Sequence, residues 1–269
     1  MNDKKTSPLP LSVLIRTFNE ADRLGRTLEA VCGLGSEIVV IDSGSTDGTV
    51  ELAESAGCRV IHHIWEGFGP QRSFGEDQCV NNWIFYIDAD EVPTHRLLAE
   101  IRALFANGEP TESAFEIRNT MVLPGNSRPC LFADVRKVTR LTDRRRARVT
   151  QDPSWDKITV TPGSTVGILN ERQWHYSFRS WKHAISKISY TSSLAAETQK
   201  KKNIWLLRTR LVTELPVEFL KFYFVRGFVW AGFKGMCFAG IQSYARSVRI
   251  RKMLADAIKR RNSESDSNR

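Results

Sequence analysis

The sequence has few of the features that define secreted, disulfide-stabilised or zinc-binding proteins. It contains five cysteines in 269 residues, an odd number. None of them are spaced as Cys-x-x-Cys, which argues against a disulfide framework and against a structural zinc site. The first residues, Met-Asn-Asp-Lys-Lys, are polar and lead into Leu-Pro-Leu without the apolar core of a signal peptide. We therefore expect a reducing, cytoplasmic location.

Acidic residues are in the minority. Lys and Arg number 39 against 30 Asp and Glu, which gives a formal net charge of +9. Such a balance favours anionic partners, namely nucleic acid, an anionic lipid surface or a phosphorylated substrate, and composition alone does not choose among them. The hydrophobic content of 41% and charged content of 26% are those of a globular protein with room for one large domain and an appendage.

The first hundred residues alternate between strand and helix patterns. Near-continuous apolar strands joined by amphipathic helices are typical of a parallel sheet covered on both faces. The expected strands are 11–16, 37–41, 59–62 and 83–87, and the expected helices are 20–31, 48–56, 70–79 and 93–105. Residues 114–170 instead read as shorter, more antiparallel pieces, followed by a helix over 181–196. The fold class is therefore α/β.

Polar side chains gather at the expected carboxyl ends of three strands. The apolar run 83–87 is followed directly by Asp88-Ala89-Asp90-Glu91. Two carboxylates in an Asp-x-Asp spacing suit a hard cation such as Mg²⁺ or Mn²⁺, which can also hold a diphosphate. Thr17, Asn19 and Glu20 follow the first strand, and Asp42 follows the second. Because ligands of such sheets bind at this edge, these residues predict a binding site.

A second basic feature is the cluster Arg-Arg-Arg-Ala-Arg at 144–148. It is either a solvated loop or a patch that faces an anion, and the sequence leaves both interpretations open.

Three motifs resemble those of the inverting family 2 glycosyltransferases, which have the GT-A fold. They are Ser-Val-Leu-Ile-Arg-Thr-Phe-Asn-Glu at 12–20, Ile-Asp-Ser-Gly-Ser-Thr-Asp-Gly-Thr at 41–49, and the acidic run at 88–91. The segment Trp-Glu-Gly-Phe-Gly-Pro-Gln-Arg-Ser at 65–73 is similar to one found in lipopolysaccharide-core glucosyltransferases of the WaaE type. The family likeness covers roughly the first 110 residues, and the subgroup likeness extends more loosely through about residue 245. The resemblance implies a Rossmann-like, mostly parallel sheet flanked by helices, with a carboxyl-terminal helical extension that associates with membranes.

The resemblance also implies a nucleotide-sugar site. Its expected residues are Thr17, Asn19, Glu20, Asp42, Arg72 and Asp88. Asp42 would read the base, usually uracil, and Arg72 stands where the subgroup has lysine, near the nucleotide or diphosphate. Asp90 would bind the Mn²⁺ or Mg²⁺ ion that bridges the diphosphate. His175 precedes a Ser-Phe-x-Ser pattern and would reach the metal or diphosphate; a hydrogen-bonded core histidine is the alternative.

An inverting displacement needs one carboxylate that takes the proton of the attacking hydroxyl. Asp156 is the candidate base, because the subgroup usually has Val-His-Glu or Val-His-Asp where this chain has Ser-Trp-Asp-Lys. The neighbouring Trp155 could stack on a sugar in an acceptor site. Asp152 is the rival base, and both aspartates could instead be turn residues around Pro153.

The segment 222–241 is apolar and long enough to span a membrane, but it carries Arg226, Lys234 and several glycines. Central basic residues disfavour a transmembrane helix, so we predict an interfacial or re-entrant element with basic flanks. A buried helix packed on the catalytic domain is the alternative. The predicted parts are a catalytic domain over 1–200, a helical membrane-surface segment over 201–258 and a disordered tail over 259–269.

Together these features predict a metal-dependent hexosyltransferase that moves a hexose, with glucose as the expected sugar, from a UDP-sugar to a heptose of the lipopolysaccharide inner core. The lipid-anchored acceptor implies a peripheral protein on the cytoplasmic face of the bacterial inner membrane. Exopolysaccharide, O-antigen and polyprenyl-phosphate acceptors stay open. A nucleotidyltransferase is the alternative enzyme, although residues 17–25 lack its Gly-rich basic signature. A nucleic-acid-binding module would not need the acidic convergence, so we expect no nucleic-acid partner.

Overall fold

The computed structural model describes residues 7–130, 135–198 and 203–267. The chain forms two compact units. The first, here called the sheet unit, comprises Met1–Thr120 and Val135–His175; the second, the helical unit, comprises Met121–Asp134 and Tyr176–Arg269. The predicted boundary at residue 200 falls outside the described residues, and the division at 200 and 258 stays a prediction.

The sheet unit is built on one eight-stranded sheet in the order β3-β2-β1-β4-β7-β6-β10-β5. The strands are β1 (Leu9–Thr17), β2 (Gly35–Asp42), β3 (Arg59–His62), β4 (Trp83–Asp88), β5 (Glu91–Pro93), β6 (Ala114–Met121), β7 (Val135–Asp143) and β10 (Val166–His175). β3, β2, β1 and β4 are parallel, whereas β7 pairs antiparallel with both β4 and β6. β8 (Ala147–Val149) and β9 (Ile158–Val160) form a separate two-stranded sheet. The predicted α/β class and the antiparallel second half are both confirmed.

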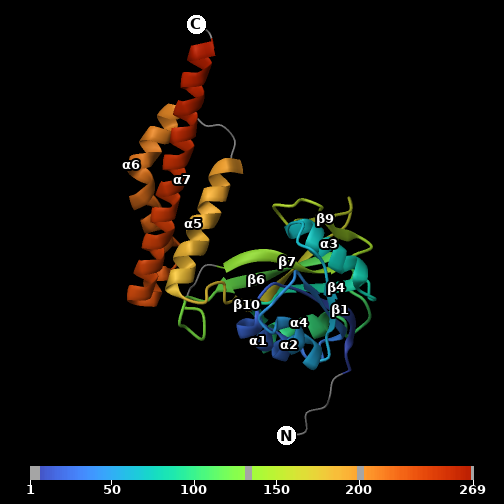
Figure 1. The fold of residues 1–269 in the computed structure, drawn as a ribbon. Coiled ribbons are helices and arrows are strands. Elements are labelled where there is room, and N and C mark those ends of the chain that lie inside the picture. The colour runs from blue at the N-terminus through green and yellow to red at the C-terminus, as the bar shows by residue number, and fades with distance from the viewer. Residues whose placement is uncertain (1–6, 131–134, 199–202, 268–269) are drawn as a thin grey trace. The chain divides into compact units, whose positions relative to one another are not determined.

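Helices cover both faces of the parallel strands (Figure 1). Four helices do this: α1 (Ala21–Val31), α2 (Thr49–Ser55), α3 (Phe68–Gln78) and α4 (His95–Leu104). Val13 and Ile15 of β1 belong to the core cluster that includes α1, α2 and α4, whereas Leu14 points to the other face, against Phe74 of α3. Burying each such side chain stabilises the fold by roughly 1.5–3 kcal/mol. This two-sided burial explains why the strands are apolar at nearly every position.

The register of the parallel strands brings the predicted site residues to one edge. Thr17 pairs with Asp42 across β1 and β2, and Arg16 pairs with Asp88 across β1 and β4. The carboxyl ends of the three strands therefore meet at the same level, as ligand binding in such sheets requires.

Arginines of the basic cluster 144–148 bind carboxylates and backbone carbonyls of the sheet unit. Arg145 and Arg146 form ion pairs with Asp143 at 2.7 and 3.0 Å. Arg144 donates to the backbone carbonyls of Glu76 and Cys79. These contacts fix the turn between β7 and β8, so the cluster has a structural role and the anion-facing interpretation gains no support.

The helical unit consists of α5 (Trp181–Thr198), α6 (Ile204–Leu220), a π-helix η1 (Lys221–Val225), a 3₁₀ turn η2 (Phe228–Ala231) and α7 (Gly232–Ser267). α7 packs against both α5 and α6 (Figure 1). Phe228 and Phe238 are buried at the centre of its larger core cluster. Through Ser267, α7 includes most of the tail 259–269, whose predicted disorder stays a prediction.

The apolar stretch predicted as one element over 222–241 is divided among η1, η2 and the start of α7. Gly227 and Gly232 have φ of 72° and 58°, in the left-handed region that breaks a continuous helix. Within the described residues, none of the helices combines the length and the hydropathy needed to cross a membrane.

Candidate active site

The loops that follow β1 and β2 are braced through Asp42. Its carboxylate accepts hydrogen bonds from the Thr17 hydroxyl at 3.0 Å and from the backbone amides of Gly44 and Ser45, each at 2.8 Å. Burial opposes the charge of Asp42, but the hydrogen bonds from Ser45, Gly44 and Thr17 outweigh it and lower its pKa. Asp42 is therefore an ionised carboxylate fixed in orientation by its hydrogen bonds, and its predicted contact with a nucleotide base stays a prediction.

Asn19 and Glu20 lie in the same braced region. Asn19 adopts φ of 53°, a left-handed conformation that asparagine tolerates, and its backbone N–H donates to the Ser45 hydroxyl at 2.8 Å. The Glu20 carboxylate forms an ion pair with Arg23 at 2.5 Å, and its backbone amide donates to Thr49. Residues of the 41–49 motif thus hold the loop of Asn19 and Glu20 in place. The nucleotide contact predicted for Asn19 and Glu20 stays a prediction.

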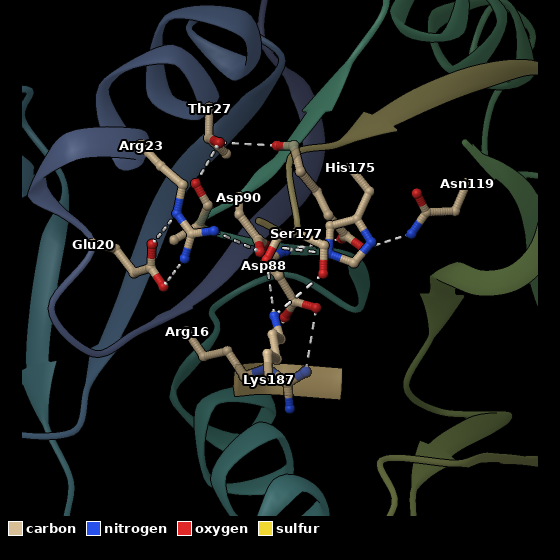
Figure 2. A network of polar contacts seen from close by, with 12 residues as sticks. Arg16, Glu20, Arg23, Thr27, Asp88, Asp90, Asn119, His175, Ser177 and Lys187 are labelled. Carbon is tan, nitrogen blue, oxygen red and sulfur yellow. Dashed lines mark hydrogen bonds and ion pairs between the residues drawn. The ribbon is translucent and has the colours of Figure 1, made fainter. Parts of the chain in front are cut away.

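Asp88 is surrounded by three guanidinium groups. Its carboxylate lies 2.7 Å from Arg16 Nε, 3.0 Å from Arg72 Nη2 and 3.2 Å from Arg140 Nη2. Burial alone would raise the pKa of Asp88, but the charges of Arg16, Arg140 and Arg72 hold it well below its usual range. Figure 2 shows Arg16 beneath this carboxylate. The three arginines therefore hold Asp88 in its ionised form.

Asp156 joins the same arginines from the loop between β8 and β9. One of its oxygens, Oδ2, lies 2.8 Å from Arg72 Nη1 and 3.1 Å from Arg16 Nη2. The rival Asp152 is exposed, and its carboxylate accepts the backbone amide of Ser154 within a turn. Of the two candidate bases, Asp156 is the one that reaches the arginines around Asp88.

The segment similar to the lipopolysaccharide-core subgroup positions this loop. The amides of Phe68 and Gly69 donate to the carbonyls of Pro153 and Asp152 at 2.9 and 3.1 Å. A Cβ at Gly69 would lie 2.2 Å from the carbonyl oxygen of Thr150, so glycine is required for this close approach. The amino-terminal end of α3 therefore carries Arg72 and also fixes the loop that carries Asp156.

Asp90 and His175 contact each other close to Asp88 and Arg16 (Figure 2). His175 Nε2 lies 3.4 Å from Asp90 Oδ1, and Arg23 Nη1 lies 3.3 Å from Asp90 Oδ2. Burial opposes ionisation of Asp90, but the hydrogen bond and charge of His175, with the charge of Arg23, lower its pKa to about 2. Burial likewise disfavours the charged imidazole, yet Asp90, Glu91 and Asp88 raise the pKa of His175.

In the part of the chain that the structure describes, no three His, Cys, Asp or Glu side chains form a preassembled metal cage. Asp90 and His175 nevertheless fit a divalent cation that takes its other ligands from a diphosphate and from water, which is the usual way Mg²⁺ is bound. An ionised carboxylate beside an imidazole also suits Mn²⁺. The fit requires His175 Nε2 to give up its proton to the solvent when the cation binds.

Sequence reasoning missed Glu91 as a member of the site. Its side chain is fully buried and accepts hydrogen bonds from Arg140 at 2.5 Å, from Asn119 at 2.7 Å and from the Asp88 amide at 3.0 Å. Asn119 comes from β6 and Arg140 from β7. The antiparallel half of the sheet thus holds the acidic run in shape from the side opposite to β1.

In open parallel sheets, ligands bind at the edge where the strands end, which is where these polar side chains lie. Comparison with known proteins gives the family. The model of glycosyl transferase family 2 matches residues 12–159. An uncharacterized glycosyltransferase of Rickettsia felis is 34% identical over 260 residues, 94% of this chain and 92% of its own length. The chain therefore belongs to glycosyl transferase family 2, as its motifs predicted.

Two further proteins are similar to this chain. The lipopolysaccharide core biosynthesis glycosyltransferase LpsC of Rhizobium meliloti is 29% identical over 84% of this chain and 85% of its own. A solved glucosyl-3-phosphoglycerate synthase of Mycobacterium tuberculosis, in complex with Mn²⁺, UDP and glucosyl-3-phosphoglycerate, is 24% identical over 40% of this chain and 43% of that chain, with a TM-score of 0.35.

Proposed function

We propose that this glycosyltransferase transfers a hexose, glucose being the expected sugar, from a UDP-sugar to a heptose of the lipopolysaccharide inner core. One observation carries the proposal: the Asp90–His175 pair and the Asp88 carboxylate, which shares Arg16 and Arg72 with Asp156, lie together at the edge where the Asp42 loop is braced. The similarity to LpsC, a lipopolysaccharide core biosynthesis glycosyltransferase, supports the acceptor class. The motif resemblance supports UDP.

The proposed reaction is a single inverting displacement. The acceptor oxygen attacks the anomeric carbon while the bond from that carbon to the diphosphate oxygen breaks, and Asp156 takes the proton of the acceptor hydroxyl. A Mn²⁺ or Mg²⁺ ion held by Asp90 and His175 would supply Lewis-acid stabilisation of the departing diphosphate. Trp155, which is 72% exposed beside Asp156, offers an aromatic face for the acceptor sugar.

The test is a thermal unfolding series with UDP, GDP and ADP, each with and without Mn²⁺, followed by UDP release from UDP-glucose with a heptose-containing core acceptor. A ligand at a hundred times its Kd stabilises the folded state by about 2.7 kcal/mol, so we expect a shift of several degrees that needs both UDP and the ion. Stabilisation by GDP or ADP instead would contradict the donor. A failure of both UDP stabilisation and UDP release would contradict the proposal as a whole.

We further propose that the helical unit binds a membrane surface, where a lipid-anchored acceptor would be presented from the cytoplasmic side. Large apolar side chains of this unit that are more than half exposed include Trp205, Val212, Phe224, Val225, Trp230 and Phe233. The basic residues Lys221, Arg226 and Lys234 lie among them in the sequence. Exposed aromatic residues interspersed with cations are typical of helices that lie in the interface of an anionic bilayer.

Replacing Val225 and Phe233 together by glutamate tests this surface. Each apolar side chain contributes roughly 1.5–3 kcal/mol on burial, so the double variant should lose at least about tenfold in partition to vesicles. Sedimentation with vesicles containing phosphatidylglycerol measures this. Val80→Glu, at a 70% exposed position of the sheet unit, is the matched control and should sediment like the wild type. Equal sedimentation of all three proteins would refute the membrane proposal.

A further inference from the structure

The cluster around Asp88 contains equal numbers of positive and negative side chains. Its guanidinium groups and carboxylates are those of Arg16, Arg72, Arg140, Asp88, Glu91 and Asp156. If Asp156 moved away, three arginines would face two carboxylates, and one positive charge would be left without a partner. A buried unpaired charge is costly, so the cluster needs an anion at the place of Asp156.

Asp156 is the member of this cluster that can be exchanged. It comes from the loop between β8 and β9, whereas Arg16, Arg72 and Asp88 come from β1, α3 and β4. Its side chain is 26% exposed, against 20% for Asp88 and 0% for Glu91. Asp88 and Glu91 each accept through both carboxylate oxygens, while Asp156 is held by Arg16 and Arg72 through the single oxygen Oδ2.

The two arginines also have capacity beyond what one carboxylate oxygen uses. Arg16 Nη1 is buried and has no hydrogen-bond partner among the described residues. Burial first, and then the nearby charges of Arg16 and Arg140, lower the pKa of Arg72 to about 10, so like charges are close to it in a buried place. A ligand with more oxygens and more negative charge than a carboxylate would satisfy the spare donor and relieve that repulsion. Arginine forks match phosphate oxygens in this way.

We propose that Arg16 and Arg72 form a subsite for the diphosphate of the donor, and that Asp156 fills this subsite until the diphosphate displaces it. The identity of the ligand rests on the proposed function. Displacement frees Oδ2 of Asp156 from both guanidinium groups, so that this oxygen becomes available to the acceptor hydroxyl. Donor binding would thereby prepare Asp156 to accept the proton of the acceptor hydroxyl, and the base would be held back while no donor is present.

The test measures the affinity for inorganic pyrophosphate and for UDP by isothermal titration calorimetry in EDTA, so that no divalent cation takes part. Asp156→Asn removes the internal competitor and should bind both ligands about tenfold more tightly, since hydrogen bonds to charged groups are the strong ones. Arg16→Gln should weaken both by a similar factor. Asp77→Asn, which changes an exposed carboxylate outside the cluster, should bind like the wild type. If Arg16→Gln does not fold, Arg16→Lys keeps the charge and removes the fork.

Two results would overturn the subsite. One is an Asp156→Asn variant that melts like the wild type and binds pyrophosphate no more tightly. The other is an absence of pyrophosphate and UDP binding in both proteins. The proposed transfer is judged separately, from UDP release by the wild type. If Asp156→Asn binds pyrophosphate more tightly but the wild type transfers no sugar, the subsite is supported and the proposed function is rejected. If the wild type transfers sugar but the affinity of Asp156→Asn is unchanged, the function is supported and the subsite is rejected.

Discussion

Asp90→Asn is expected to lower the divalent-dependent kcat/KM by at least about a thousandfold, because Lewis-acid stabilisation of a leaving group supplies several kcal/mol and each 1.4 kcal/mol is tenfold. Asparagine has nearly the same shape and can still accept the hydrogen bond from His175. Asparagine lacks the negative charge of the Asp90 carboxylate, which His175 and Arg23 keep ionised in the wild type. The loss should therefore fall on cation binding and turnover, with little change in the fold.

The measurement is UDP release from UDP-glucose over a Mn²⁺ titration, together with the paramagnetic resonance signal of free Mn²⁺ in the presence of UDP. Wild-type protein should remove free Mn²⁺ from solution, and Asp90→Asn should leave it free. Asp77→Asn serves as the matched control, because its carboxylate is exposed and pairs with Arg148 away from the site. Near-normal turnover and Mn²⁺ uptake by Asp90→Asn would contradict the proposal that this residue binds the cation.

The parallel half of the sheet was predictable because its physics is local. Each of β1, β2 and β4 is buried on both faces, so each appears in the sequence as a short apolar run between helical patterns. Parallel strands present their carboxyl ends at one edge, which is why Thr17, Asp42 and Asp88 could be grouped before their contacts were known. Their partners required the three-dimensional structure.

Arg16, Arg140 and Glu91 show why the rest of the site could not be predicted. Arg16 lies near the end of an apolar strand. A charged side chain there indicates an ion pair with a buried partner, but the sequence does not identify that partner. Arg140 lies in an antiparallel strand, where an arginine normally faces solvent. Its partners Asp88 and Glu91 lie about 50 residues earlier, and no local pattern records such a pairing.

The helical unit shows a different limit. Hydropathy finds the apolar stretch 222–241, but it does not locate the two left-handed glycines, Gly227 and Gly232, that divide it into η1, η2 and α7. Backbone conformation at a glycine depends on the packing of the surrounding fold, such as the burial of Phe228 against Phe238 in the core of the helical unit, which hydropathy does not record. The sequence does give the apolar and basic composition of this segment. The structure adds which of its apolar side chains are exposed, among them Phe224, Val225, Trp230 and Phe233.

Asp156→Asn is expected to lower kcat by about 10²- to 10⁴-fold, the usual contribution of a general base, without weakening UDP binding. Asparagine keeps the size of the side chain but cannot accept a proton from the acceptor hydroxyl. Because the substitution also removes a competitor of the diphosphate, KM for the donor should stay the same or fall. Removal of a residue that only shapes the loop would instead raise KM as kcat falls.

Asp152→Asn is the matched comparison, since Asp152 lies in the same loop, four residues earlier, and fixes a turn through the Ser154 amide. It should retain most of kcat, because an amide oxygen at this position can still accept that hydrogen bond. The ratio of the kcat values separates the two roles: Asp156→Asn should lose the larger part of kcat, and Asp152→Asn should stay close to the wild type. If Asp152→Asn shows the larger loss of kcat, then Asp152 is the residue that accepts the proton. The ion pairs of Asp156 with Arg16 and Arg72 would then have only a structural role in holding the loop.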